Sequence, residues 1–214
     1  MHSIQYLYSM EIPSKLLELA VNEFSRLPGV GKKTALRYAL HLLRTDPAQV
    51  KQFSQTMHNL RENIHFCREC HNISDDTLCG ICARPSRDRS ILCIVQDVRD
   101  VMAIENTGFF KGVYHVLGGL ISPVDGIAPS QLFLETLPAR ASAASEVILA
   151  LSSSMEGETT AFYIARKLQS IPVTISTLAR GVAVGDELEY TDELTLGKSL
   201  QNRIPYPLNT AISS

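Results

Sequence analysis

The sequence lacks two features that would place the chain in a membrane or outside the cell. None of its apolar runs approaches the roughly 20 residues that a helix needs to span a bilayer. The N-terminal stretch MHSIQYLYSMEIPS has neither a basic start nor a long apolar core, so it predicts no secretory signal. We therefore expect a cytoplasmic protein in a reducing compartment, where paired cysteines are more often metal ligands than disulfides.

The chain also lacks an overall positive charge. Its formal net charge is −2 at pH 7, which by itself argues against a nucleic-acid ligand. The charges are unevenly distributed, however. Between Arg26 and Lys51 the basic residues are opposed by Asp46 alone, whereas acidic residues gather from Glu156 onward. This asymmetry predicts one part of the chain that contacts phosphates and another that contacts something else.

A nine-residue motif lies inside the basic segment. The run Leu27–Ala35 reads L-P-G-V-G-K-K-T-A and joins two amphipathic segments, which is typical of a helix-hairpin-helix. Gly29 and Gly31 allow backbone conformations that other residues resist, and they let a ligand approach the chain closely. The amide groups that open the second helix then face a phosphate. The simpler alternative is a tight turn without a ligand.

Positive side chains follow the two glycines. Lys32, Lys33 and Arg37 lie on the first turns of the expected second helix, within reach of neighbouring phosphates. Nothing in this segment reads base edges. We therefore expect sequence-independent, salt-sensitive DNA binding through Gly29, Gly31 and the three cations.

Four of the five cysteines form the pattern C-x2-C-x8-C-x2-C. Two such pairs bring four thiolates around one tetrahedral ion, the geometry that Zn²⁺ adopts with sulfur ligands. Four protein ligands leave no position for a catalytic water, so we expect a structural site. Its ligands are Cys67, Cys70, Cys79 and Cys82. The fifth, Cys93, lies in an apolar run and is expected to pack in a core.

The pattern of apolar residues predicts a multidomain α/β protein. Three amphipathic segments before the cysteines indicate an N-terminal helical unit, and the third has an apolar stripe that runs from Val50 to Ile64. After the cysteines, short apolar runs alternate with helical segments, which favours a mainly parallel sheet. The expected strands are 91–95, 113–117, 146–151 and 172–176. The expected helices of this part are 98–106 and 157–169.

From about Pro13 to Arg203 the chain resembles the bacterial RecR family of recombination mediators. The resemblance rests on the run 27–35, the cysteines with Pro85–Asp88, and three later blocks. These blocks are 114–126, 156–161 and 185–193. The resemblance implies a helix-hairpin-helix domain over 1–63, a four-cysteine zinc module over 64–84, a Toprim domain over 87–182 and a C-terminal region over 183–214.

The resemblance further implies a non-enzymatic, DNA-binding clamp in recombinational repair. It implies a ring-like homo-oligomer, a tetramer, that encircles DNA at the nucleoid and assists RecA loading together with RecO and RecF. It assigns DNA contacts to Lys33 and Arg37, whereas Lys32 stands where relatives often have proline and is included for its charge alone. We expect Glu156 and Glu158 to dock a partner protein.

The alternative is a Mg²⁺-dependent Toprim nuclease or topoisomerase-like enzyme. Such enzymes use a glutamate after the first strand and a later acidic pair that holds Mg²⁺. Here Gln96 occupies the first position, and its amide cannot exchange a proton. Asp97 is expected on the opposite face of that strand. Glu156 and Glu158 form the later pair, so a weak Mg²⁺ site is the second cofactor expectation.

Other interpretations of the chain have less support. A zinc-ribbon transcription factor would need an element that reads base edges, and the sequence shows none. The C-terminal part contains no G-x-x-x-x-G-K-[ST], so ATP binding is not expected. His115, on an expected strand, is predicted to be packed or hydrogen-bonded rather than a ligand.

Overall fold

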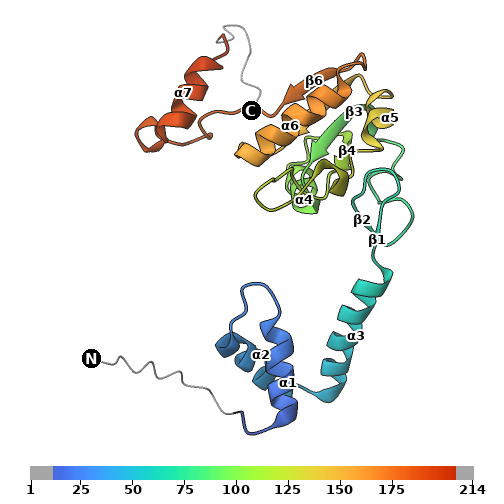
Figure 1. The fold of residues 1–214 in the computed structure, drawn as a ribbon, viewed down its shortest axis with the longest axis vertical. Coiled ribbons are helices and arrows are strands. Elements are labelled where there is room, and N and C mark those ends of the chain that lie inside the picture. Colours follow the sequence, from blue (N-terminus) through green and yellow to red (C-terminus); the bar gives the residue numbers. More distant parts are fainter. Residues whose placement is uncertain (1–11, 206–214) are drawn as a thin grey trace. The chain divides into compact units, whose positions relative to one another are not determined.

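The chain forms two compact units, residues 1–64 and 65–214 (Figure 1). The computed structural model describes residues 12–205, so the outermost parts of the first and last expected domains lie outside it. Among the described residues, no helix is both long and apolar enough to cross a membrane.

Three helices make up the described part of the first unit. They are α1 (Lys15–Ser25), α2 (Lys32–Arg44) and α3 (Pro47–Asn63). The side chains of Ser14 and Asp46 begin α1 and α3 by accepting hydrogen bonds from amide groups of the first turn. α1 and α2 pack against each other around three buried side chains, Val21, Ala35 and Ala39.

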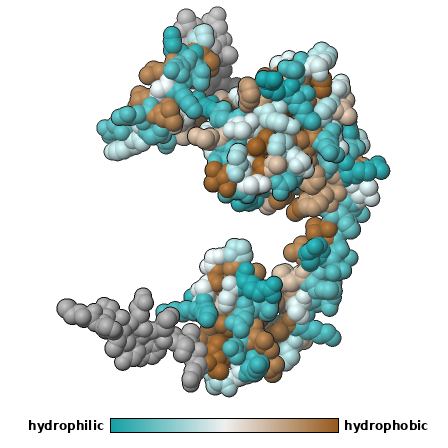
Figure 2. All heavy atoms as spheres, viewed as in Figure 1, coloured by the Kyte–Doolittle hydropathy of each residue, from teal (hydrophilic) through white to brown (hydrophobic). Residues whose placement is uncertain are grey.

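The third helix keeps the predicted apolar stripe but does not bury it. No residue of α3 is buried, and Phe53, Met57 and Leu60 are 44%, 46% and 54% exposed. Hydrophobic side chains accordingly reach the surface of this unit (Figure 2). The periodicity that predicts the helix is therefore present, but nothing in the described part of the chain covers this face.

The second unit holds a small ladder and a four-stranded parallel sheet in the order β4-β3-β5-β6. The ladder strands are β1 (His65–Phe66) and β2 (Ile73–Ser74); the sheet strands are β3 (Asp88–Val95), β4 (Gly112–Val116), β5 (Glu146–Ala150) and β6 (Thr174–Thr177). The helices are α4 (Val98–Asn106), α5 (Leu137–Ala141), α6 (Met155–Leu168) and α7 (Glu193–Gln201), with the 3-10 turns η1 (Pro129–Gln131) and η2 (Leu188–Tyr190). The multidomain α/β fold with a parallel sheet is thus confirmed.

Both faces of the sheet are covered, as the apolar run in β3 requires. Leu92 and Ile94 pack in the core beneath α5 and α6, whereas Cys93 and Val95 pack on the side of α4. Cys93 is 2% exposed, which confirms its predicted place in a core. Burial raises the pKa of its thiol to about 12, so this cysteine stays protonated and unreactive.

Asp97 does not lie on a strand, and the prediction about its direction is wrong. β3 ends at Val95, and Asp97 is the N-cap of α4. Its carboxylate accepts the backbone N–H of Arg99, while the Asp100 side chain accepts the N–H of Asp97, which completes a capping box. The chain turns from strand to helix at this point, so the alternation of a strand no longer applies.

Candidate functional site

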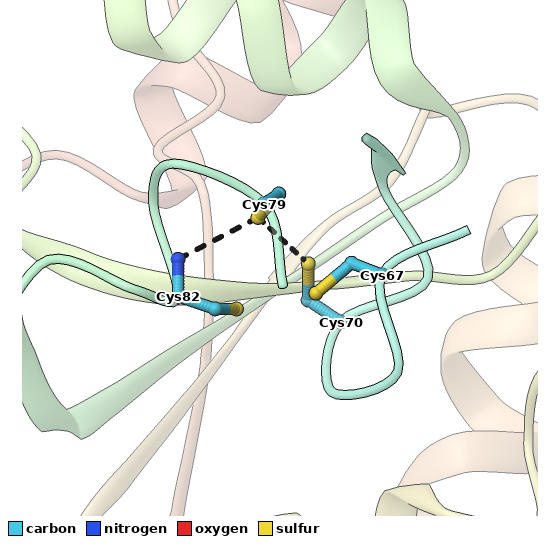
Figure 3. Close-up of side chains that lie close together, drawn as sticks. All are labelled: Cys67, Cys70, Cys79 and Cys82. Atoms are coloured by element: carbon cyan, nitrogen blue, oxygen red, sulfur yellow. Dashed lines mark hydrogen bonds between the residues drawn. The ribbon is translucent and has the colours of Figure 1, made fainter. Parts of the chain in front are cut away.

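Four cysteine side chains converge from two loops of the second unit (Figure 3). Their sulfur atoms lie within 4.8 Å of one another, and the Sγ atoms of Cys70 and Cys79 are 3.5 Å apart. Four sulfurs at about 2.3 Å from a tetrahedral Zn²⁺ would be separated by about 3.8 Å, so the cluster has the right size. Each cysteine is at most 4% exposed. Together with Cys67 and Cys82, these residues form a structural zinc site.

The crowding of the thiols explains why a cation is needed. The pKa of Cys79 is lowered because Cys70 and Cys82 donate hydrogen bonds to its sulfur, and the backbone N–H of Cys82 points at the same atom from 3.5 Å. The hydrogen bond to Cys79 in turn raises the pKa of Cys70 to about 12. The thiolate of Cys79 therefore forms readily, whereas the thiol of Cys70 retains its proton. A divalent cation allows all four to ionise together.

The predicted DNA-binding motif forms the turn between α1 and α2. Gly29 has a φ of 76°, a left-handed conformation that favours glycine. Gly31 is the N-cap of α2 and has an extended backbone with a φ of −79°, so an unusual conformation is required at Gly29 alone. A Cβ atom at Gly31 would meet no atom within 4 Å. Gly31, Lys32 and Lys33 are all exposed, so the start of α2 faces solvent.

α2 begins in an electrostatically unfavourable way. No side chain caps it, and its first turn contains Lys32 and Lys33 but no acidic residue. The first amide groups of a helix carry partial positive charge, which the two lysines increase. Every other described helix of eight or more residues has a side-chain cap. An anion at this end would supply both the missing acceptor and the missing charge.

The basic surface continues along α2 beyond the predicted residues. Lys33, Arg37, His41 and Arg44 recur at intervals of four, four and three, so they share one side of the helix. All four are exposed and line the same hollow. His41 and Arg44 are not among the predicted DNA-binding residues, although their helical spacing from Lys33 and Arg37 is visible in the sequence.

The residues expected for Toprim chemistry follow two neighbouring strands. β3 and β5 pair in parallel and end at Val95 and Ala150. Gln96 follows β3 directly, whereas Glu156 lies six residues beyond the end of β5, in the first turn of α6. This edge of a parallel sheet is where ligands commonly bind. Within residues 12–205, however, the cysteine cluster is the one group of three or more His, Cys, Asp or Glu residues close enough to hold a metal ion.

Acidic residues near this edge already have other partners. Hydrogen bonds from Arg99 hold the pKa of Asp97 below its usual range, so this carboxylate is ionised at neutral pH and is a poor general acid. Asp100 accepts the backbone N–H groups of Gln96 and Asp97. Glu158 forms an ion pair with Arg180.

Gly157 fixes the position of the two predicted partner-binding glutamates. A Cβ atom at Gly157 would lie 2.0 Å from the backbone oxygen of Ser152. The first turn of α6 therefore packs so closely against the loop after β5 that only glycine fits at this position. The Ser154 hydroxyl caps the helix by accepting the N–H of Gly157. Glu156 and Glu158 therefore flank a tightly held point at the start of α6, where the helix dipole favours negative charge.

Comparisons with known families match the chain in four consecutive segments. The RecR helix-hairpin-helix matches residues 17–61, and the four-cysteine zinc finger domain of RecR matches residues 64–83. A Toprim domain matches residues 90–179, and the RecR C-terminal segment matches residues 181–204. The segments follow the order of the helical unit, the cysteine loops and the parallel sheet.

Several curated relatives are similar over nearly the whole chain. The recombination protein RecR of Amoebophilus asiaticus is 56% identical over 92% of this chain and 100% of its own length. That of Flavobacterium johnsoniae is 55% identical over 92% of this chain and 97% of its own. That of Porphyromonas gingivalis is 56% identical over 91% of this chain and 95% of its own. The chain therefore belongs to the RecR family of recombination proteins.

Proposed function

We propose that this protein is a non-enzymatic clamp that holds DNA during recombinational repair. The observation that carries the proposal is the start of α2, which is uncapped, basic and open to solvent. A DNA phosphate at this point would accept hydrogen bonds from the free amide groups and neutralise the charge of Lys32 and Lys33. Arg37 lies one turn further along the same side and would contact a neighbouring phosphate. Such contacts would bind DNA without reading its sequence.

Assembly into a ring would compensate for the weakness of a single contact. One helix terminus and a few cations give modest affinity, but several copies bound to the same DNA act at high effective concentration. The exposed apolar stripe of α3 supports a homo-oligomer because isolated monomers rarely leave such a face uncovered. We assign the assembly as a tetramer around DNA, acting at the nucleoid.

The proposal that the protein neither cuts nor joins DNA strands rests on the side chains at the edge of the β-sheet. Gln96 replaces the glutamate that Toprim enzymes use for proton transfer, and an amide cannot serve in its place. Asp97 caps α4 and is paired with Arg99. The edge of the sheet then remains available for a partner protein instead of a scissile phosphate.

RecO and RecF are the proposed protein partners, and the start of α6 is the proposed docking point for RecO. Glu156 is half-buried and Glu158 is exposed, on either side of the rigid Gly157. We expect Glu156→Ala to weaken RecO binding at least fivefold, measured by calorimetry or surface plasmon resonance. The exposed Glu18→Ala on α1 serves as the control. Unchanged RecO affinity in the Glu156→Ala variant would remove this assignment.

DNA binding through α2 is tested by removing two charges. We expect the double variant Lys33→Gln, Arg37→Gln to bind duplex DNA more weakly and with less dependence on salt. Removing one phosphate contact should reduce the slope of log K against log salt by about 0.9. Fluorescence anisotropy between low and moderate salt measures both quantities. Lys167→Gln on α6 is the matched control. Wild-type affinity and slope in the double variant would reject α2 as the contact.

A further inference from the structure

Aromatic and basic side chains lie next to one another on the exposed side of α6. Ile164 and Leu168 pack in the core beneath this helix. Five exposed residues of α6 line one hollow, and they recur at helical spacing, so they share one side of the helix. They are Thr159, Phe162, Tyr163, Arg166 and Lys167. Among the described residues, no acidic side chain lines this hollow, although the whole chain is net negative.

The other wall of the hollow comes from the segment that follows β4. Ile121 and Pro129 line it, and the hollow has a volume of about 550 Å³. The backbone N–H of Ile121 donates to the hydroxyl of Thr160 over 2.9 Å, and Thr160 is fully buried on α6. This hydroxyl in turn donates to the backbone oxygen of Glu156 over 2.7 Å. The segment is therefore fixed against the helix, and the hollow is already formed without a ligand.

Phe162 presents an uncovered aromatic ring at the hollow. The residue is 66% exposed, and Tyr163 beside it is 37% exposed. The guanidinium of Arg166 lies over the ring of Phe162, with its Cζ atom 5.9 Å from the ring centroid. This contact holds the ring and the cation on the same surface, while most of the Phe162 side chain remains open to a further group.

The two cations beside the ring have no acidic partner of their own. Neither Arg166 nor Lys167 forms an ion pair with any residue between 12 and 205. Glu158, on the same helix, is paired with Arg180 instead. Adjacent like charges repel each other, and a negatively charged ligand would relieve that repulsion. The hollow therefore favours an anion that also carries an apolar or planar group.

We propose that this hollow binds an unpaired nucleotide of single-stranded DNA. The base stacks on Phe162, and the neighbouring phosphates contact Arg166 and Lys167. Sites for single strands commonly combine aromatic rings with a positively charged groove, because every base has a π face and every nucleotide carries a phosphate. Four residues of helix span about 6 Å, so the ring and the guanidinium lie within reach of one nucleotide. The site is separate from the start of α2, and its ligand does not depend on duplex binding there.

A duplex and an acidic peptide fit the hollow less well. The bases of a duplex are stacked on each other, so the ring of Phe162 cannot reach them. The hollow also has the size of a small organic group, which a whole duplex cannot enter. An acidic peptide would neutralise the two cations, but it offers a planar group to Phe162 only where its sequence contains one. A single strand offers both groups at every position.

The test measures single-strand binding by the full-length Lys33→Gln, Arg37→Gln variant, in which α2 contributes least. In this parent, we expect Phe162→Ala to bind a fluorescein-labelled oligothymidylate about tenfold more weakly and Phe162→Tyr to bind it within about twofold of the parent. Fluorescence anisotropy measures both affinities. The matched control is Phe109→Ala, which removes another exposed ring (90% exposed) and should bind like the parent.

Removal of one charge gives a second readout. We expect Lys167→Gln to reduce the slope of log K against log salt for oligothymidylate by about 0.7, the value for one phosphate contact with a single strand. The same variant should bind duplex DNA with wild-type affinity and slope, because the duplex does not enter the hollow. This readout decides the matter if Phe162→Ala fails to fold, which circular dichroism would show.

Several results would overturn the proposal. Parent-like affinity for oligothymidylate in Phe162→Ala, or no binding by the parent, would show that the ring does not hold a single strand. An equal loss of oligothymidylate and duplex binding, when Phe162→Ala is made in the wild-type chain, would show an indirect effect. Competition by thymidine monophosphate at equal nucleotide concentration would indicate a site for free nucleotides. Equal competition by polyglutamate would indicate an acidic protein partner.

Discussion

The junction between β4 and α4 depends on one nearly buried ion pair. Arg87 exposes 7% of its side chain and Glu105 exposes 28%. Besides Glu105, the Arg87 guanidinium contacts the backbone oxygens of Phe110 and Gly112, and the Tyr114 hydroxyl donates to Glu105 over 2.7 Å. Burial acts to raise the pKa of Glu105, but the hydrogen bonds from Arg87 and Tyr114 outweigh it and hold that pKa below its usual range.

This pair makes stability depend on pH in a defined direction. A carboxylate whose pKa is lowered by folding stabilises the folded state above its unfolded pKa of about 4.5. That stabilisation is lost as the pH falls through the lower, folded pKa. Glu105→Gln leaves Arg87 without a charge partner, and we expect it to reduce the free energy of unfolding by about 2 kcal/mol at pH 7. The difference from wild type should shrink below about pH 4.

Urea unfolding at pH 7 and at about pH 3.5 measures this difference. Glu23→Gln is the matched control, because the pair between Glu23 and Arg26 is 71% and 76% exposed. Such exposed pairs contribute about 0–1 kcal/mol, so the control should change little at either pH. An equal loss of stability at both pH values in Glu105→Gln would show that the charge of Glu105 is not what stabilises the junction.

At the scale of elements, sequence patterns locate the longer segments and miss the short ones. The periodic stretch 98–106 coincides with α4, and the apolar run at 91–95 lies inside β3. β3 starts three residues earlier, at Asp88, because its first residues are exposed and polar and give no apolar signal. The two-residue strands β1 and β2 and the five-residue α5 are too short for any period to appear.

The candidate sites divide in the same way. The cysteine ligands are predictable because close spacing in the sequence places them around one ion. The sequence predicts where α2 starts. That α2 lacks a side-chain cap, unlike the other described helices of eight or more residues, is apparent only from the structure. The contacts of Arg140 with Tyr114 and His115 are not predictable, because these residues lie 26 and 25 positions away from it and follow no repeating pattern. Tertiary packing alone brings these groups together.

At the scale of the whole molecule, the amount of uncovered apolar surface is the main finding. The stripe on α3 is one part of it. A second part lies in the C-terminal segment, where Leu188, Leu194 and Ile204 are 62%, 68% and 84% exposed. Clusters of this kind on a protein surface mark places of association. The proposed ring needs two such surfaces on each chain, because each copy must contact two neighbours.

Assembly should therefore fail when the α3 stripe is made charged. We expect Met57→Glu, Leu60→Glu to reduce the mass in solution toward that of a single chain, 23.6 kDa, or of a dimer held by the other surface. Both side chains are about half exposed in the single chain, so the change should leave the fold intact, as circular dichroism would show. Sedimentation velocity with and without DNA measures the mass.

The control for this experiment changes charge on another side of the same helix. Gln55→Glu lies on the opposite side of α3 from the stripe and should leave the assembly unchanged. In the double variant, DNA affinity should fall together with the mass of the assembly, because fewer copies of α2 are linked on the same DNA. Each single α2 contact itself is unchanged. Full assembly in the double variant would exclude the α3 stripe as an interface. Loss of assembly with unchanged DNA affinity would show that a single α2 terminus is sufficient to hold DNA.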